Sequence, residues 1–424
     1  MPSLKDMKWP SSPLKAKDLD ENQLKQFLQI RAFYEKSAFV NEGHVEVRTL
    51  GPKEFTEPIP PGESAISALA VHTNGKIYGG TGGQKSHLFF YDPTPDADVV
   101  VGIGIVAENA RVTSLVSCED GNVYGATESL DGGSGVIFQY KPCETLLKEA
   151  DFKGLGAREI FDMSAEDQVF FSIVDPCHSA GKIETIISPL QGEGISDIVI
   201  DNERKIIYGV SSQTGTLFKF DISTKEVSSI GRIDANGNFS QKLLILPDGN
   251  LYGAGLYGRL FKLNAESGSM RFLDACAPAL KGRELYNRVT NWIYDKDKQL
   301  IYGGTVDGIV FRYDLHNDKM TCIGKPIDQS LIRALTLGNE GTVYGICGEK
   351  GKCCHMFIYN DESRELKDMG VLLARVERPW YGYEISCAAT GADGRIYYGE
   401  EDRISNLFMY FPPVKKILRQ YNFS

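Results

Sequence analysis

The sequence lacks the features that would insert it into a membrane or export it. No run of 18 apolar residues occurs, so no transmembrane helix is expected. The opening stretch MPSLKDMKWPSSPLKAKDLDENQ holds no continuous apolar segment of the kind found in a secretory signal. The nine cysteines, an odd number, are expected to be reduced thiols. We therefore expect a cytoplasmic protein.

An excess of positive charge and the familiar nucleotide and hydrolase motifs are also missing. The 46 Lys and Arg residues are outnumbered by 56 Asp and Glu residues, for a net charge of −10. This balance argues against nucleic acid or an anionic membrane as a partner. The chain has no P-loop, no G-x-G-x-x-G between a strand and a helix, no G-x-S-x-G and no EF-hand-like calcium loop. The function classes that those motifs define are excluded.

What the sequence does contain is a repeated phrase. LIYGGTVDGIVFRYD near position 300 has counterparts in IIYGVSSQTGTLFKFD, NLYGAGLYGRLFKLN and TVYGICGEKGKCCHMFIYND. Its aromatic marker recurs at intervals of 38 to 53 residues, at Tyr78, Tyr124, Phe170, Tyr208, Tyr252, Tyr302, Tyr344 and Tyr397. Such a period suits a unit of four short strands, the blade of a β-propeller.

The local patterns agree with this fold. Aromatic and β-branched residues alternate through each unit, as in strands. Hairpin turns are signalled by Asn74-Gly75, Asp120-Gly121, Asp248-Gly249 and Asp393-Gly394. We predict an all-β protein, a propeller of about eight four-stranded blades, or alternatively seven if the degenerate unit around Phe170 forms no sheet of its own. Residues 1–43 are predicted to be an N-terminal helical arm, and residues 44–424 a single propeller domain.

The two ends of the ring suggest how it closes. Residues 44–50, HVEVRTL, alternate in strand fashion, and we predict that they add an outer strand to the last blade and remove an open edge. In the arm, Leu24, Phe27, Leu28 and Tyr34 recur at helical spacing. The predicted amphipathic helix docks on the propeller or, alternatively, binds a partner.

Candidate binding residues lie where the innermost strand of each blade begins, at one mouth of the central channel. Alignment of the units places Arg111, Arg158 and Arg288 in one column, and Arg333 two residues further along on the same strand face. A guanidinium group matches carboxylate, sulfate or phosphate geometrically. We predict that these arginines bind an anionic substrate. The alternative is that they pair with nearby carboxylates, such as Glu108, Glu159 and Glu284, and merely join blades.

Other candidates come from links and loops at the same end of the ring, where propellers commonly bind ligands. His87, His178, Tyr257 and Tyr286 are candidates for proton transfer. Further substrate contacts are predicted at Arg259, Asn287, Trp380 and Tyr381. For each of them a packing or surface role is the alternative.

The cysteine-rich loop ICGEKGKCCH is weighed separately. Cys347, Cys353, Cys354 and His355 do not have the paired spacing of a closed zinc site. Free thiols rank first, a Cys347–Cys353 disulfide second and a metal third. No cofactor is predicted, and a divalent metal is left open.

Over residues 64–413 the recurring phrase DGxhYGG…LFxYD, in which h is an apolar residue, makes the blades resemble β-propellers broadly. The phrase GGTGGQKSHLFFYDP and the arginine-bearing inner strands resemble those of propeller polysaccharide lyases such as oligogalacturonate, ulvan and rhamnose–glucuronate lyases. That resemblance implies that Arg111, Arg288 and Arg333 hold a uronate carboxylate and stabilise the charge that develops on it. It further implies His87 or His178 as base and Tyr257 or Tyr286 as acid. The two-histidine spacing expected in the first blade and the metal-binding histidines of those families are missing here.

The sequence therefore favours a carbohydrate-active propeller that acts on an anionic, uronate-containing oligosaccharide by β-elimination at the channel mouth. Its partner would be that oligosaccharide or another anionic small molecule. The alternatives are a non-enzymatic propeller scaffold for protein–protein interaction and a metal-dependent hydrolase or lactonase.

Overall fold

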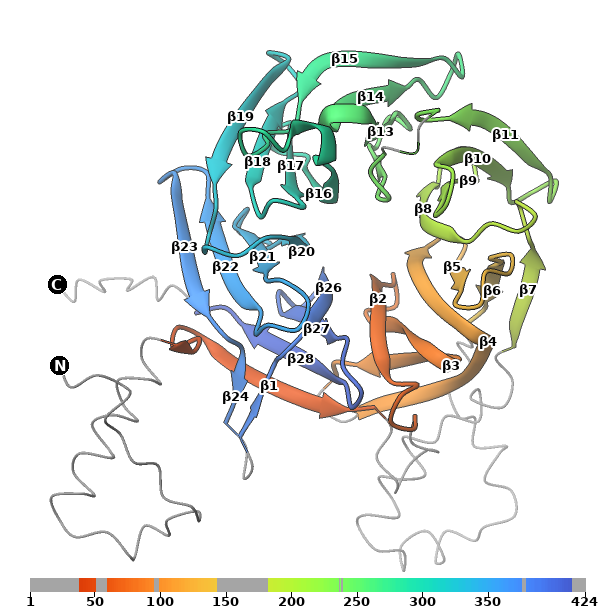
Figure 1. Ribbon diagram of the computed structural model, residues 1–424. Helices are drawn as coiled ribbons and strands as arrows, with labels where there is room; N and C mark the ends of the chain where they lie inside the picture. The colour runs from red at the N-terminus through yellow and green to blue at the C-terminus, as the bar shows by residue number, and fades with distance from the viewer. Residues whose placement is uncertain are drawn as a thin grey trace, which may run out of the picture.

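The protein is a ring of β-sheets, as a computed structural model shows (Figure 1). The structure describes residues 38–50, 59–94, 99–142, 182–235, 237, 239–375 and 379–413. The predicted all-β propeller is confirmed. Within these ranges no helix is long and apolar enough to cross a membrane. The amphipathic helix expected in the N-terminal arm lies outside the described residues.

The sheets follow one another in chain order around the ring (Figure 1). The first is six-stranded and contains β2 (Ala65–Val71), β3 (Ile77–Asp92), β4 (Val99–Ser117), β5 (Val123–Ser129), β6 (Ile137–Tyr140) and β7 (Ile183–Ile187). Four-stranded sheets follow: β8 (Ile195–Asp201), β9 (Ile206–Ser211), β10 (Thr216–Asp221) and β11 (Val227–Arg232); then β12 (Leu244–Ile245), β13 (Leu251–Ala254), β14 (Arg259–Leu263) and β15 (Met270–Cys276).

The second half of the ring has the same plan. Its sheets are β16 (Val289–Asp295), β17 (Leu300–Thr305), β18 (Val310–Asp314) and β19 (Lys319–Gly324); β20 (Ile332–Leu337), β21 (Val343–Cys347), β22 (His355–Asn360) and β23 (Glu365–Gly370); and β26 (Ile385–Thr390), β27 (Ile396–Glu400), β28 (Asn406–Phe411) and β1 (His44–Thr49). A small hairpin joins β24 (Leu373–Ala374) and β25 (Trp380–Tyr381), and the short 3-10 turns η4 (Leu256–Gly258) and η5 (Glu284–Tyr286) sit in loops.

The expected count of eight blades, or alternatively seven, is wrong: the described residues form six blade sheets. One reason is that β4 runs on from the outer strand of the first repeat unit into the inner strand of the second, so that two units share one sheet. The other is that β6 pairs directly with β7, from Tyr140 opposite Ile183 to Ile137 opposite Ile187. The degenerate unit around Phe170 lies between these two strands and outside the described residues.

Ring closure follows the sequence prediction. β1 pairs antiparallel with β28 from His44 opposite Phe411 to Thr49 opposite Asn406, so the N-terminal strand completes the last sheet (Figure 1). Val45 on β1 is buried in the same apolar cluster as Phe408 and Tyr410 of β28. The predicted closing strand is confirmed, and it removes the open edge that β28 would otherwise present.

The repeated phrase reflects close packing between a glycine of the second strand and a phenylalanine ring of the third strand. In the unit of Tyr302, a Cβ placed on Gly303 would lie 2.2 Å from the ζ carbon of the Phe311 ring. The same glycine–phenylalanine contact recurs at Gly79/Phe89, Gly125/Phe138, Gly209/Phe218, Gly253/Phe261 and Gly345/Phe357. The glycine is therefore required so that the aromatic ring of the third strand can lie directly on the backbone of the second.

Hydroxyl groups at bulges connect successive inner strands. The inner strands shift register at the same position, and the bulged residue in four of them is Ser67, Thr113, Thr290 or Ser386. Each hydroxyl donates to a carbonyl of the next inner strand around the ring, at Val112, Ile195, Ile332 and Ile66 respectively, over 2.5 to 2.7 Å. These bonds satisfy backbone carbonyls that the bulges leave unpaired, and they fix the wall of the channel.

Candidate functional site

The central channel holds a cavity of about 640 Å³. Its wall is made by the inner strands β2, β4, β8, β12, β16, β20 and β26 and the links before them. Four basic side chains line it (Arg111, Lys242, Arg288 and Arg333) against two acidic ones (Glu128 and Asp197). Two further carboxylates, Glu384 and Glu401, lie within 3.4 Å of Arg111 or Arg333. The cation that favours an anionic ligand is therefore Arg288, which has no ion pair among the described residues.

Arg288 is the most available of these cations. It immediately precedes β16, is exposed, and lines the cavity. Its backbone carbonyl accepts a hydrogen bond from the Val306 N–H at 3.0 Å, which holds the main chain in place. Among the described residues, no ion pair or side-chain hydrogen bond engages its guanidinium group. Within the described part of the chain, none of its donors is engaged, so they can face a ligand.

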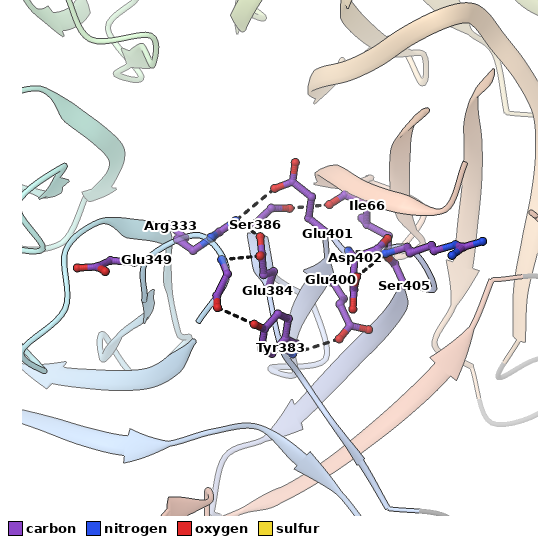
Figure 2. Close-up of polar contacts among 12 residues, drawn as sticks. Ile66, Arg333, Glu349, Tyr383, Glu384, Ser386, Glu400, Glu401, Asp402 and Ser405 are labelled. Atoms are coloured by element: carbon purple, nitrogen blue, oxygen red, sulfur yellow. Dashed lines mark hydrogen bonds and ion pairs between the residues drawn. The ribbon is translucent and has the colours of Figure 1, made fainter. Parts of the chain in front are cut away.

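Arg111 and Arg333 share one carboxylate, that of Glu401. Arg111 Nη2 lies 3.0 Å from Glu401 Oε1, and Arg333 Nη2 lies 3.4 Å from Glu401 Oε2. Arg333 also lies 3.4 Å from Glu384 Oε2 (Figure 2). The sequence alternative that the arginines pair with carboxylates is thus correct for these two. The partners it named are not the observed ones: Glu284 accepts the Gly282 N–H, and Glu159 lies outside the described residues.

Local structure explains how the two arginines reach this point. Arg333 occupies the bulge of β20, where other inner strands carry a hydroxyl residue, so its side chain extends to the next sheet. Arg111 lies over Gly82, where an added Cβ would come within 3.0 Å of its γ carbon. The absence of a side chain at position 82 lets Arg111 cross the first blade and meet Glu401 of the last.

Both guanidinium groups keep unused donors. Arg333 is 8% exposed as a side chain, and its Nη1 is buried with no hydrogen-bond partner among the residues that the structure describes. The same holds, over those residues, for Arg111 Nε. A buried donor with no partner costs about 1–3 kcal/mol. An additional acceptor at this position, such as an oxygen of a ligand, would recover that energy.

A second acidic group, Glu400, lies behind the mouth. It is 2% exposed and accepts hydrogen bonds from the Tyr383 N–H at 3.2 Å and from the Asn406 backbone and side-chain N–H groups at 3.2 and 3.1 Å (Figure 2). Burial raises the pKa of Glu400 above its ordinary value near 4.5, while these hydrogen bonds and one from the Trp380 side chain oppose the shift. Glu400 thereby anchors the link that carries Trp380 to the β27–β28 loop.

This raised pKa predicts a pH effect on stability. The folded state binds the Glu400 proton more tightly than the unfolded state, so the contribution is fully present below about pH 4.5 and is lost as the pH rises through the folded pKa. A Glu400→Gln variant should lack that loss. As the pH rises through the folded pKa, the unfolding free energy of the wild type should fall relative to that of the variant. Urea denaturation at a series of pH values measures this difference. Parallel curves would show that Glu400 titrates normally.

The opposite wall carries an ion pair of its own. Lys242 Nζ lies 3.1 Å from Asp197 Oδ1 and donates to the Thr113 carbonyl at 3.2 Å. The second oxygen of Asp197 accepts the Leu243 N–H at 2.8 Å. Trp292 is buried and donates its indole N–H to the Lys242 carbonyl. This part of the wall is held rigid by its own contacts.

The predicted catalytic residues do not gather around the arginines. His87 Nε2 lies 2.8 Å from Glu63 Oε2, both are 14% exposed, and neither lines the cavity. Tyr257 in η4 and Tyr286 in η5 are 50% and 64% exposed, and these two turns contact each other on the rim. The structure therefore brings Tyr257 and Tyr286 together but separates them from His87. His178 lies outside the described residues.

The other predicted substrate contacts are dispersed. Arg259 donates from Nε to the Leu273 carbonyl and lies 3.4 Å from Asp274, away from the cavity wall. The prediction for Asn287 is wrong: it is 2% exposed and donates to the Ala277 carbonyl at 2.7 Å, so it packs beneath η4. Trp380 and Tyr381 are exposed on β25. Arg158 belongs to the residues that the structure does not describe.

The cysteine-rich loop holds free thiols. Cys347, Cys353 and Cys354 are unbonded, and burial raises the pKa of Cys347 to about 12. The imidazole of His355 lies 3.0 Å from Asp368 instead of facing these sulfurs. No cluster of three or more potential metal ligands occurs in the described part of the chain.

Sequence reasoning missed Glu401, Lys242 and Asp197. A sequence signal for Glu401 exists. Glu128 lies opposite Arg111 in the strand register, and the Glu401 N–H bonds to the carbonyl of Glu384, which holds the position of Arg111 in its own unit. Glu401 and Glu128 therefore occupy equivalent positions at the end of the second strand. A comparison of these second-strand ends would have shown acidic residues facing the arginine column.

Comparison with known proteins adds the fold alone. No protein-family model matches the sequence, and a search of curated proteins gave no match. Among solved structures, the chain is similar to the extracellular domain of the "putative one component system BT4673" from B. thetaiotaomicron, with a TM-score of 0.54 and 14% sequence identity. The similarity covers 87% of this chain and 40% of that one. The protein is thus a β-propeller, and the resemblance to polysaccharide lyases gains no support from these comparisons.

Proposed function

We propose that the protein binds an anionic, uronate-containing oligosaccharide at the arginine-bearing mouth of its channel. The observation that carries this proposal is Arg288, an exposed cation on the cavity wall without an ion pair among the described residues. A guanidinium group and a carboxylate form a bidentate, charge-assisted pair. The cavity of about 640 Å³ lies within the range of small-ligand sites.

Other features support an oligosaccharide in particular. Exposed aromatic side chains, Tyr257 and Tyr286 on one part of the rim and Trp380 and Tyr381 on another, offer apolar faces for sugar rings. The cavity wall also carries serine and threonine residues. Their hydroxyls donate to backbone carbonyls, so toward a ligand they can only accept hydrogen bonds from its hydroxyl groups. The proposal keeps the cytoplasmic location expected from the sequence, where the ligand would be an imported oligosaccharide.

β-Elimination is the finer form of this proposal, and the geometry supports it less directly than binding. Elimination needs a base beside the uronate C5 proton and an acid beside the leaving oxygen. Of the candidates, His87 is held by Glu63, and the two rim tyrosines lie outside the cavity lining. Binding requires only the arginines that are already in place.

A second candidate function is recruitment of another protein. Eight of the ten exposed large apolar side chains in the described ranges lie in loops at the mouth end: Leu130, Tyr257, Leu280, Leu285, Tyr286, Trp380, Tyr381 and Ile404. Exposed apolar side chains gathered on one face are typical of protein interfaces. This function becomes the leading one if the protein binds no sugar.

The experiment that tests the proposal is calorimetric titration of the full chain with galacturonate oligomers and with the matching neutral galactose oligomers. We expect the acidic oligomers to bind and the neutral ones to bind much more weakly, with affinity falling as salt is added. Ultraviolet absorbance of the unsaturated product, followed in the same samples, tests elimination. Absence of binding by every acidic oligomer would contradict the proposal.

A further inference from the structure

The mouth of the channel contains two separate groups of cations. Arg288 stands alone before β16, while Arg111 on β4 and Arg333 on β20 are drawn together by Glu401. A ligand with a single negative group needs only Arg288. A ligand with two or more negative groups could also bind the second group of cations, with which the carboxylate of Glu401 already pairs.

Glu401 has the geometry of a ligand carboxylate. Its two oxygens are divided between two guanidinium groups, at 3.0 Å from Arg111 and 3.4 Å from Arg333. Its side chain is 25% exposed, so rotation about its side-chain bonds leads directly into solvent. Its backbone is held independently by the hydrogen bond from the Glu401 N–H to the Glu384 carbonyl. The carboxylate can therefore leave without the loop moving.

The two arginines offer more than Glu401 uses. Arg333 Nη1 and Arg111 Nε are buried, and no described residue offers either of them a hydrogen bond. Arg333 also retains Glu384, whose other oxygen accepts the Gly351 N–H at 2.7 Å. If Glu401 left, Arg111 would have no ion pair with a described residue, and Arg333 would keep one. The pair would then have a net positive charge and unused donors facing a second anionic group.

We propose that Glu401 is an internal competitor for this second anion subsite, displaced from Arg111 and Arg333 by a carboxylate or sulfate of the ligand. This inference rests on the proposed function and names a specificity device within it. Because Glu401 must first be displaced, an anionic group binds the second subsite more weakly than it would if Glu401 were absent. The channel mouth then selects ligands that carry at least two correctly spaced anionic groups, because one group binds Arg288 while another replaces Glu401.

The test compares two probes, galacturonate and trigalacturonate, on the full chain by calorimetry. Glu401→Gln is expected to tighten trigalacturonate binding about threefold to tenfold and to leave galacturonate binding unchanged. The control is Glu349→Gln, which removes the same charge from the loop after β21. Glu349 lies 2.5 Å from Lys352 Nζ and does not line the cavity. That variant should leave both affinities unchanged.

The outcomes separate this inference from the proposed function. If the wild type binds trigalacturonate and Arg288→Ala weakens it, but Glu401→Gln weakens it too or leaves it unchanged, then Glu401 positions the arginines and the inference is overturned. If Glu349→Gln tightens binding equally, the effect is one of general charge, and local competition is again refuted. If neither the wild type nor Glu401→Gln binds either probe, the proposed function fails as well. Glu401→Asp, with a shorter side chain, repeats the test should the glutamine variant fold poorly.

Discussion

Truncating Phe311 to alanine should lower the free energy of unfolding by about 3–5 kcal/mol, the usual cost of removing a buried phenylalanine. The ring is fully buried and packs edge-on against Trp292, with centroids 5.9 Å apart, inside the cluster that joins two neighbouring blades. The change would leave a cavity at the point where the second and third strands are closest. Urea denaturation of the full chain measures the loss.

Gly303 provides the control for this interpretation. Alanine at position 303 should destabilise the protein by about 1–3 kcal/mol, because its Cβ would meet the Phe311 ring at 2.2 Å. In a Phe311→Leu background the same substitution should cost much less, since the ring is gone. An undiminished cost in that background would show that the glycine is needed for some other reason than the aromatic contact.

Replacing Arg288 by alanine should weaken binding of trigalacturonate about 10- to 100-fold. This range corresponds to the loss of one charge-assisted hydrogen-bonded pair, which contributes about 1.5–3 kcal/mol. The fold should be unaffected, because no side-chain hydrogen bond or ion pair of Arg288 with a described residue is lost. Arg288→Lys should recover only part of the affinity, since lysine keeps the charge but not the planar fork.

Arg259→Ala is the matched control for Arg288. This arginine is also exposed near the mouth, but its guanidinium group is bound to the Leu273 carbonyl and faces Asp274. Its removal should change the affinity less than twofold, roughly the effect of a distant surface charge. Equal losses in the two variants would indicate that the uronate responds to the overall field and is not held by Arg288.

Much of the fold was predictable because it depends on local sequence patterns. The turns at Asn74-Gly75 and Asp120-Gly121 need a left-handed residue, and both glycines have φ of 84°. The strand at residues 44–50 alternates and has no partner of its own, so its place on the last blade followed from the need to cover an edge. The number of sheets did not follow, because the continuity of β4 and the pairing of β6 with β7 depend on which strands meet in space.

The candidate site was predictable in part for the same reason. The arginine column emerged from the repeat, and Arg111, Arg288 and Arg333 all line the cavity. The partners Glu384 and Glu401 lie 51 and 68 residues from Arg333 in the sequence. The bulge at Arg333 decides which carboxylates its side chain reaches. A comparison of second-strand ends indicates Glu401, but no spacing in the sequence shows that one carboxylate joins two arginines. Asn287 shows a second limit of the sequence pattern. A polar residue in a link between blades is not always exposed, because neighbouring residues can bury it.

The position of a uronate in the protein tests the central claim most directly. A crystal structure of the full chain with trigalacturonate should place a carboxylate of the sugar within hydrogen-bond distance of the Arg288 guanidinium group, in the channel beside β16. Sugar density on the outer strands, or a channel mouth free of sugar in crystals of a complex that forms in solution, would contradict the account.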